Sequence, residues 1–213
     1  MPMQYGPIIQ SGSKAFGRNA AVLIGFTVVY SVVAGLLYLA LKEVTLAIAT
    51  SESPSWTLLI SSLALAVLKV LVHLIGSLAL VNGALMAARG QTFRFGQLFS
   101  ETQQLFNMLG LHVFAAVAVL AGLLAFGLPG IYLSVGYWLA AFWLVDRKQS
   151  FLDAMAGSRR MITPHWFDVA VLLIVVGCIA GVGTLAFGFG LLVTTPLALC
   201  IAASAYLRLS EAG

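Results

Sequence analysis

The fold is decided first by residues 56–88, which read WTLLISSLALAVLKVLVHLIGSLALVNGALMAA. About 18 predominantly apolar residues mark a candidate membrane-spanning helix, and about 20 cross the hydrocarbon. This run is longer, so the helix that it predicts must tilt strongly or project beyond the hydrocarbon. The Ser53-Pro54-Ser55 sequence before it is typical of a helix start with proline in the first turn.

Apolar runs of this kind recur along the whole chain. Hydrophobic residues make up 61% of its 213 residues and charged residues 8%, against about 25% charged residues in an ordinary soluble domain. A water-exposed surface cannot be built from so few polar residues, so we predict an all-α, polytopic membrane protein. Its six expected spans are Ala20 to Leu41, Trp56 to Ala88, Leu105 to Phe126, Ile131 to Val145, Phe167 to Phe187 and Leu191 to Leu207.

Two connections between these runs are short and contain glycine. Leu128-Pro129-Gly130 separates the third run from the fourth, and Phe187-Gly188-Phe189-Gly190 separates the fifth from the sixth. Such clusters are typical of tight turns, so each pair of runs is expected to form a helical hairpin. The first run exceeds the apolar core of about 7 to 15 residues found in cleavable signal peptides, so we expect it to remain as a span.

The basic residues flank the apolar runs instead of forming one stripe. The chain has 11 Lys and Arg residues and a formal net charge of +4. This spread argues against a nucleic-acid surface, and the positive-inside rule places both termini and the two larger even-numbered loops in the cytoplasm. Lys42 and Lys69 are the two basic residues that do not lie on the cytoplasmic side in this arrangement. The nine residues on the cytoplasmic side are Lys14, Arg18, Arg89, Arg94, Arg147, Lys148, Arg159, Arg160 and Arg208.

A short internal repeat follows the second and the fourth spans. Arg89-Gly90-Gln91-Thr92-Phe93 recurs as Arg147-Lys148-Gln149-Ser150-Phe151. The repeat predicts three stacked hairpin units, at about 8–90, 91–148 and 149–210, within a single membrane domain covering 1–213. Because each unit holds two spans, the units run in the same sense, unlike the inverted repeats of many secondary transporters.

Each copy of the repeat leads into a stretch with apolar residues at helical spacing. We expect these stretches, and a weaker one before the first span, to form amphipathic helices at the cytoplasmic membrane surface. In the first copy the apolar side holds Phe95, Leu98, Phe99, Thr102, Leu105 and Phe106, opposite Arg94, Gln97, Glu101 and Gln104. In the second copy Phe151, Leu152, Met155 and Ile162 oppose Asp153, Arg159 and Arg160, and the weaker stretch contains Ile8, Ile9, Ala15 and Phe16.

The C-terminal half carries a family resemblance. The motifs are Leu128-Pro129-Gly130-Ile131-Tyr132-Leu133, Leu144-Val145-Asp146, Ala154 to Arg160 with His165-Trp166-Phe167, and Gly188 to Leu192 with Thr195-Pro196. They resemble uncharacterised bacterial six-helix membrane families and the membrane domain attached to some glycerophosphodiester phosphodiesterases. The resemblance implies a bacterial cytoplasmic (inner) membrane protein, and no catalytic chemistry comes with it because the soluble catalytic domain of those enzymes has no counterpart in this sequence.

Lys69 and His73 are the candidate contacts for a lipid or another ligand. They stand four residues apart, on one face of the second span, where an ionisable residue suggests a functional role. Counted back from Arg89, Lys69 lies about 30 Å away, at the outer edge of the hydrocarbon. Two interpretations stay open at this point: an interfacial anchor that snorkels to the surface, and a contact with a ligand or a lipid headgroup.

We expect no metal site, cofactor site or catalytic group. On the same scale His73 lies about 24 Å from the cytoplasmic face, His112 about 10 Å and His165 at the surface, so these histidines should not meet at one metal ion. His112 is expected to bond to a neighbouring backbone or side-chain group. Cys178 and Cys200 lie within apolar runs, where a thiol usually packs as a small hydrophobic group.

Two further patterns leave alternatives open. Gly177 and Gly181, with Gly183 beyond, have the spacing that lets helices approach closely, either within this chain or in a dimer. Four acidic residues lie near the expected cytoplasmic surface, where we predict that they pair with Arg147, Arg159, Arg160 or solvent. They are Glu101, Asp146, Asp153 and Asp168.

The sequence favours a non-catalytic function. No nucleophile, base and orienting group can be assembled from its residues, so an enzyme is the least favoured class. The leading hypothesis is an accessory or scaffold component of a membrane complex, acting through a membrane-protein partner or a second copy. The alternative is a carrier or binder of a lipid or another amphiphilic molecule held between the hairpin units. Membrane lipid is an expected partner under either hypothesis.

Overall fold

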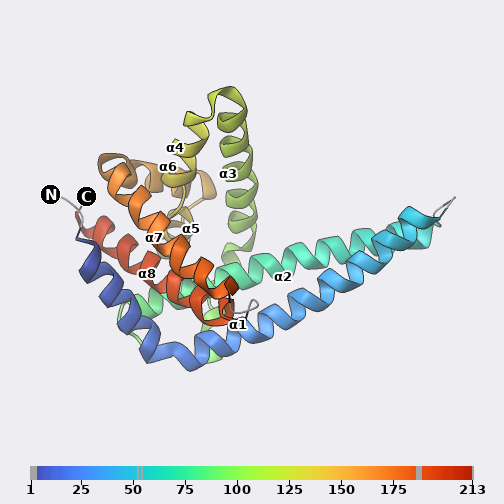
Figure 1. Ribbon diagram of the computed structural model, residues 1–213, viewed down its shortest axis with the longest axis horizontal. Helices are drawn as coiled ribbons and strands as arrows, with labels where there is room; N and C mark the ends of the chain where they lie inside the picture. The colour runs from blue at the N-terminus through green and yellow to red at the C-terminus, as the bar shows by residue number, and fades with distance from the viewer. Residues whose placement is uncertain (1–3, 52, 54, 186–188, 213) are drawn as a thin grey trace.

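The computed structural model describes residues 4–51, 53, 55–185 and 189–212 (Figure 1). All regular elements in this part of the chain are helices, and six helical stretches are long and apolar enough to cross a membrane. The predictions of an all-α protein and of six spans are therefore confirmed at this level. Pro54 and the Phe187-Gly188 part of one predicted turn lie outside the described residues.

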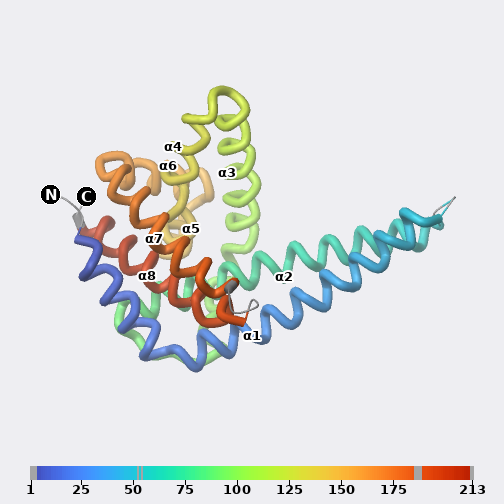
Figure 2. Tube along the Cα trace, in the orientation of Figure 1, coloured from blue at the N-terminus to red at the C-terminus, as the bar shows by residue number. Residues whose placement is uncertain are grey.

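The first two helices lie side by side over part of their length and form an arm that joins the rest of the protein at one end only (Figures 1 and 2). Helix α1 (Tyr5–Thr50) begins well before the predicted span, and α2 (Trp56–Ala88) matches its prediction. The buried residues of α1 are Ile8, Gly12, Ala15, Asn19, Leu23, Phe26 and Thr27, and those of α2 lie between Leu74 and Ala87. Residues 28–50 and 56–73, here called the outer arm, bury no residue and project from the body (Figures 1 and 2).

Helices α3 (Leu105–Phe126) and α4 (Leu128–Gly136) form a second projecting pair, which points in a different direction (Figure 2). The chain reverses at Gly127, whose φ of 74° favours glycine, so the turn comes one residue before the predicted Leu128-Pro129-Gly130. Pro129 instead lies in the first turn of α4. A Cβ atom on Gly122 would lie 2.7 Å from the Gly130 nitrogen, so the two backbones approach closely because both residues are glycine.

The predicted fourth span is interrupted. Helix α4 ends at Gly136, and α5 (Ala140–Arg147) begins after a turn of three residues. The buried Ser158 hydroxyl donates a 2.8 Å hydrogen bond to the Gly136 carbonyl at the break. Glycine weakens the helix at this point, and the serine supplies a donor at the interruption. A run of apolar residues alone does not reveal such a break.

The two repeat copies adopt different structures. The first forms two short 3₁₀ helices, η1 (Phe95–Phe99) and η2 (Thr102–Gln104), instead of one regular helix. Asn82 of α2 donates 3.2 Å hydrogen bonds to the carbonyls of Gln97 and Leu98, which holds this segment against α2. The second copy forms α6 (Phe151–Ile162), capped by the Ser150 hydroxyl and followed by η3 (Thr163–His165).

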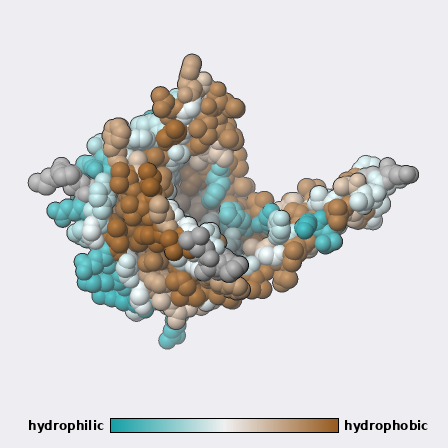
Figure 3. Space-filling model, in the orientation of Figure 1, coloured by the Kyte–Doolittle hydropathy of each residue, from teal (hydrophilic) through white to brown (hydrophobic). Residues whose placement is uncertain are grey.

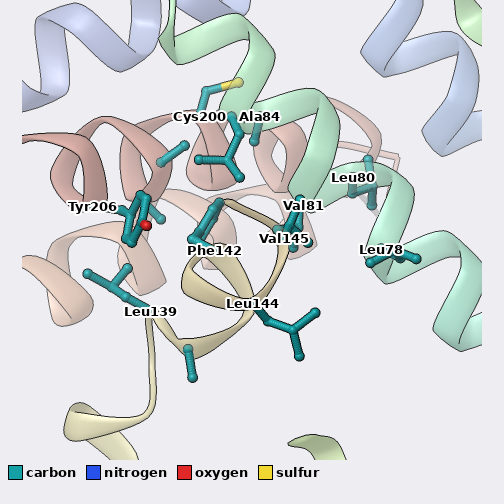
Figure 4. Close-up of a cluster of buried hydrophobic side chains, with 14 of the residues drawn as sticks. Leu78, Leu80, Val81, Ala84, Leu139, Phe142, Leu144, Val145, Cys200 and Tyr206 are labelled. Atoms are coloured by element: carbon teal, nitrogen blue, oxygen red, sulfur yellow. The ribbon is translucent and has the colours of Figure 1, made fainter. Parts of the chain in front are cut away.

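The main core lies where α2, α5 and α8 (Leu191–Ala212) meet (Figure 4). The aromatic rings of Phe142 and Tyr206 face each other there, with centroids 6.1 Å apart. Helix α7 (Trp166–Leu185) packs along α8. At their far end a Cβ atom on Gly183 would lie 2.7 Å from the Gly190 carbonyl carbon, so the two helices approach closely there.

Much of the apolar side-chain surface faces outward. Leu124 and Phe126 at the end of α3 are 87% and 88% exposed. Figure 3 shows hydrophobic residues over the α3/α4 pair and α7, whereas hydrophilic residues gather near the termini. Exposed patches of this extent are rare in monomeric soluble proteins, so hydrocarbon is the solvent that suits these helices.

The approach of α1 to α8 depends on a glycine. A Cβ atom on Gly12 would lie 2.5 Å from the Ile201 Cα, whereas one on Gly17 would have no neighbour within 4 Å. We expect Gly12→Ala to separate the helices and destabilise the fold by about 1 to 3 kcal/mol. Gly17→Ala, the matched control, should be neutral or stabilising by up to about 1 kcal/mol. Thermal unfolding in detergent measures both, and a Gly12→Ala variant as stable as the parent protein would contradict this packing.

Candidate functional site

The predicted contacts Lys69 and His73 belong to a polar cluster at the base of the outer arm. The Tyr30 hydroxyl of α1 lies 3.1 Å from His73 Nδ1, and the His112 ring of α3 lies 5.8 Å from the His73 ring, centroid to centroid. Lys69 Nζ lies 5.6 Å from the centroid of the Tyr38 ring, in a cation–π arrangement. We call these five residues the histidine cluster. It joins the first three α-helices of the chain.

The prediction that His73 and His112 lie at different depths is wrong, because their rings are in contact. The depth scale counted residues back from Arg89 along α2 and forward from the start of α3. The last part of α2, from Leu74 to Ala87, is buried in the body, and α3 passes close to α2 at His73. Because α2 and α3 cross, the number of residues counted along each helix does not give its depth in the membrane on a common scale.

Gly76 and Tyr30 are members of this site that the sequence reasoning missed. A Cβ atom on Gly76 would collide with the Tyr30 ring, so glycine at this position lets the ring lie against α2 and reach His73. Gly76 follows His73 by three residues, which places both on one side of α2. That spacing is the only indication of this contact in the sequence, and it does not identify Tyr30 as the partner of Gly76.

The chemistry of the histidine cluster is that of binding. His112 Nδ1 lies 2.8 Å from the Met108 carbonyl and donates to it, so Nε2 is the ring nitrogen that this bond does not use. No carboxylate lies within 4 Å of the Lys69 ammonium among the described residues. The described chain also holds no group of three or more His, Cys, Asp or Glu side chains placed to hold a metal ion. The cluster therefore offers one cation and several hydrogen-bonding groups to a ligand.

A second polar centre surrounds Asp146 at the end of α5. Its carboxylate forms an ion pair with Arg89 at the end of α2, and it accepts a 2.6 Å hydrogen bond from the Tyr206 hydroxyl of α8. The Asp146 side chain is only 13% exposed. Arg147, the partner that the sequence suggested, lies farther away at 3.9 Å. This carboxylate links three helices, which indicates a structural role.

The other acidic residues at this end of the protein also have defined partners. Glu101 forms a 2.9 Å ion pair with Lys148, and Asp168 accepts a 3.0 Å hydrogen bond from the Tyr5 hydroxyl. Asp153 accepts a hydrogen bond from Ser150. The predicted pairs with Arg159 and Arg160 are not found, since neither arginine has a carboxylate within 4 Å in the described part of the chain.

A half-open cavity of about 560 Å³ lies beside these ion pairs. It is formed by α5, α6, η3 and the end of α8, and Arg147 and Arg160 are the arginines among its lining residues. Arg94, the remaining predicted interfacial cation, is exposed on the segment before η1. The cavity is lined by Trp143, Arg147, Gly157, Arg160, Met161, Pro164, His165, Leu209 and Ser210.

The glycine residues of α7 differ in their packing, and the two cysteine residues differ in their exposure. Cβ atoms on Gly177 and Gly181 would have no neighbour within 4 Å, so this pair does not pack against another described part of the chain. Gly183 packs closely against another part of the chain, because it contacts Gly190. Cys200 is fully buried, as expected of a packing residue, whereas Cys178 is exposed on α7.

Comparison of this chain with protein-family profiles, with curated proteins and with solved structures finds no match. The resemblance to bacterial six-helix membrane families therefore stays a prediction.

Substitutions of Lys69 distinguish an anchoring role from an anion contact. We expect Lys69→Leu to leave membrane insertion and thermal stability unchanged, because the side chain is exposed and its cation can be replaced by an apolar group. Lys69→Asp should lower expression and stability, since a carboxylate is repelled by the face of Tyr38 and by an anionic headgroup. Equal yield and unfolding temperature for the two variants would contradict the headgroup contact.

Proposed function

We propose that this chain is a non-catalytic integral membrane protein that serves as a scaffold or accessory component of a membrane complex. The observation that carries the proposal is the outer arm, which buries no residue against its own chain. Helices in lipid associate through close packing and interhelical hydrogen bonds. A hairpin that stands apart from its body leaves most of its surface free for the helices of a partner or of a second copy.

The splayed arrangement of the helix pairs supports the same proposal. The outer arm and the α3/α4 pair point away from the body in different directions (Figure 1). Figure 3 shows hydrophilic residues where the outer arm meets the body, and the ring contact of His73 with His112 joins α2 to α3. A partner helix seated in the angle between the two pairs would gain apolar contacts along both of them and polar contacts where they meet.

We further propose that the termini and the even-numbered loops lie in the cytoplasm of a bacterium, with the chain in its inner membrane. The distribution of Lys and Arg supports this orientation. Contacts within the structure support it as well, because they bring together the segments that the rule assigns to one side. Tyr5 of α1 bonds to Asp168 at the start of α7, and Lys148 pairs with Glu101. We call loops 89–104 and 147–165, with the chain termini, the basic end.

The finer architecture follows from this orientation. We propose three hairpin units, formed by α1 with α2, α3 with α4 and α5, and α7 with α8, each starting and ending at the basic end. Helix α6 would then lie at the membrane surface, since its buried side faces the protein and Arg159 and Arg160 are exposed. The close contacts at Gly122 and Gly183 support the second and third hairpins.

Site-specific photo-crosslinking in native membranes tests the scaffold proposal. A benzophenone amino acid is placed at Leu36 or Leu63 of the outer arm, which are 64% and 67% exposed. Ile174 of α7, at 65%, is the matched control. Both arm positions should give the same discrete protein adduct, either with a partner or with a second copy, and Ile174 should give lipid adducts. Lipid adducts alone at all three positions would contradict the proposal.

A second candidate function is the binding of a lipid or another amphiphile. The cavity at the basic end favours it, because that cavity combines cationic and aromatic groups beside membrane-spanning helices.

A further inference from the structure

The cavity at the basic end has an unbalanced charge. Three groups that can carry positive charge line it, namely Arg147, Arg160 and His165, and none of its lining residues is acidic. Asp146, which lies nearby, pairs with Arg89 and accepts a hydrogen bond from the Tyr206 hydroxyl, and its contact with Arg147 is longer, at 3.9 Å. Arg160 has no carboxylate within 4 Å in the described part of the chain. An anion is the ligand that would complete this site.

The walls of the cavity are held in place before any ligand binds. The Trp143 indole nitrogen donates a 3.1 Å hydrogen bond to Gln149, and the Arg147 guanidinium lies 4.8 Å from the centroid of the Trp143 ring. A Cβ atom on Gly157 would collide with this ring, so glycine allows it to lie against α6. Trp143 thus positions Arg147, and little side-chain freedom is lost when an anion binds.

The opposite wall is tied to α4. The Tyr132 hydroxyl lies 2.9 Å from the Thr163 hydroxyl, and the Trp166 indole donates to the Tyr132 carbonyl at 3.2 Å. These bonds hold η3, which contributes Pro164 and His165 to the cavity. A smaller cavity of about 380 Å³ adjoins on this side and shares Arg160 and Pro164 with the first. Arg160 therefore lines both cavities.

The surroundings favour a phospholipid over a small soluble anion. The cavity volume of about 560 Å³ falls within the range of about 300 to 1,000 Å³ that is typical of sites for whole organic ligands. An exposed apolar stripe begins two residues after His165 and runs along α7 through Phe167, Val171 and Ile174. Such a stripe is a suitable surface for an acyl chain, while planar guanidinium groups bind phosphate oxygens in pairs.

We propose that this cavity binds the phosphate group of an anionic phospholipid, with Arg160 and Arg147 as its main contacts and His165 at its edge. The inference rests on the second candidate function and is independent of the scaffold proposal, because none of these residues belongs to the outer arm. The headgroup would occupy the cavity, and one acyl chain would lie along α7.

Native mass spectrometry of the delipidated full-length chain in detergent tests this proposal. The probes are dioctanoyl phosphatidylglycerol, the zwitterionic dioctanoyl phosphatidylcholine, and glycerol 3-phosphate as the soluble source of the same phosphate chemistry. Arg160→Gln should weaken phosphatidylglycerol binding about tenfold or more, as expected for loss of a charge-assisted contact. Arg160→Lys should weaken it less, because the charge remains. Lys14→Gln removes an equal charge from an exposed position of α1 and should change the affinity less than about twofold.

The outcomes separate the parts of the inference. Equal weakening by Arg160→Gln and Lys14→Gln, with unchanged thermal unfolding of both, would mean general charge attraction and would overturn the site. Equal affinity for phosphatidylcholine would overturn the requirement for an anionic lipid. If glycerol 3-phosphate binds as tightly and depends on Arg160 in the same way, the phosphate contact stands and the assignment to lipid is wrong. None of these results bears on crosslinks from the outer arm.

Discussion

A backbone group placed in hydrocarbon must find its hydrogen-bond partner within the protein, and this constraint governs where the chain departs from straight helices. At the break between α4 and α5 the Ser158 hydroxyl bonds to the Gly136 carbonyl. In the segment after α2, Asn82 donates to two carbonyls of η1. Both side chains are buried, and no buried side-chain polar atom in the described residues is without a partner. Both of these irregular segments lie in the body, whereas the outer arm, residues 28–50 and 56–73, is helical.

The number of spans could be predicted from the sequence, because long apolar runs are a direct consequence of a lipid environment. The interruption after Gly136 could not, since it depends on Ser158, which lies on another helix. The 3₁₀ form of residues 95–104 likewise accompanies contacts with Asn82. Long apolar runs indicate that a helix is surrounded by lipid, but they carry little information about which helices pack against each other.

The same limit applies to the candidate sites. Lys69 and His73 could be selected from the sequence because polar residues stand out in an apolar run, yet the contact of His73 with His112 depends on how α3 crosses α2. The sequence does not predict the cavity at the basic end, although it places Arg147 and Arg160 at the expected cytoplasmic surface. Their convergence depends on α5 and α6 meeting across the second repeat copy. The cavity and the outer arm lie in separate parts of the molecule.

An even number of crossings would keep the basic end on one side of the membrane and the tip of the outer arm on the other. Labelling of single cysteines in whole cells with a membrane-impermeant maleimide measures this arrangement, in a variant with Cys178 and Cys200 replaced by alanine. We expect Ser53→Cys at the arm tip to be labelled from outside, whereas Ser13→Cys and Ala156→Cys should be labelled only after the cells are opened. Labelling of either basic-end position in intact cells would contradict it.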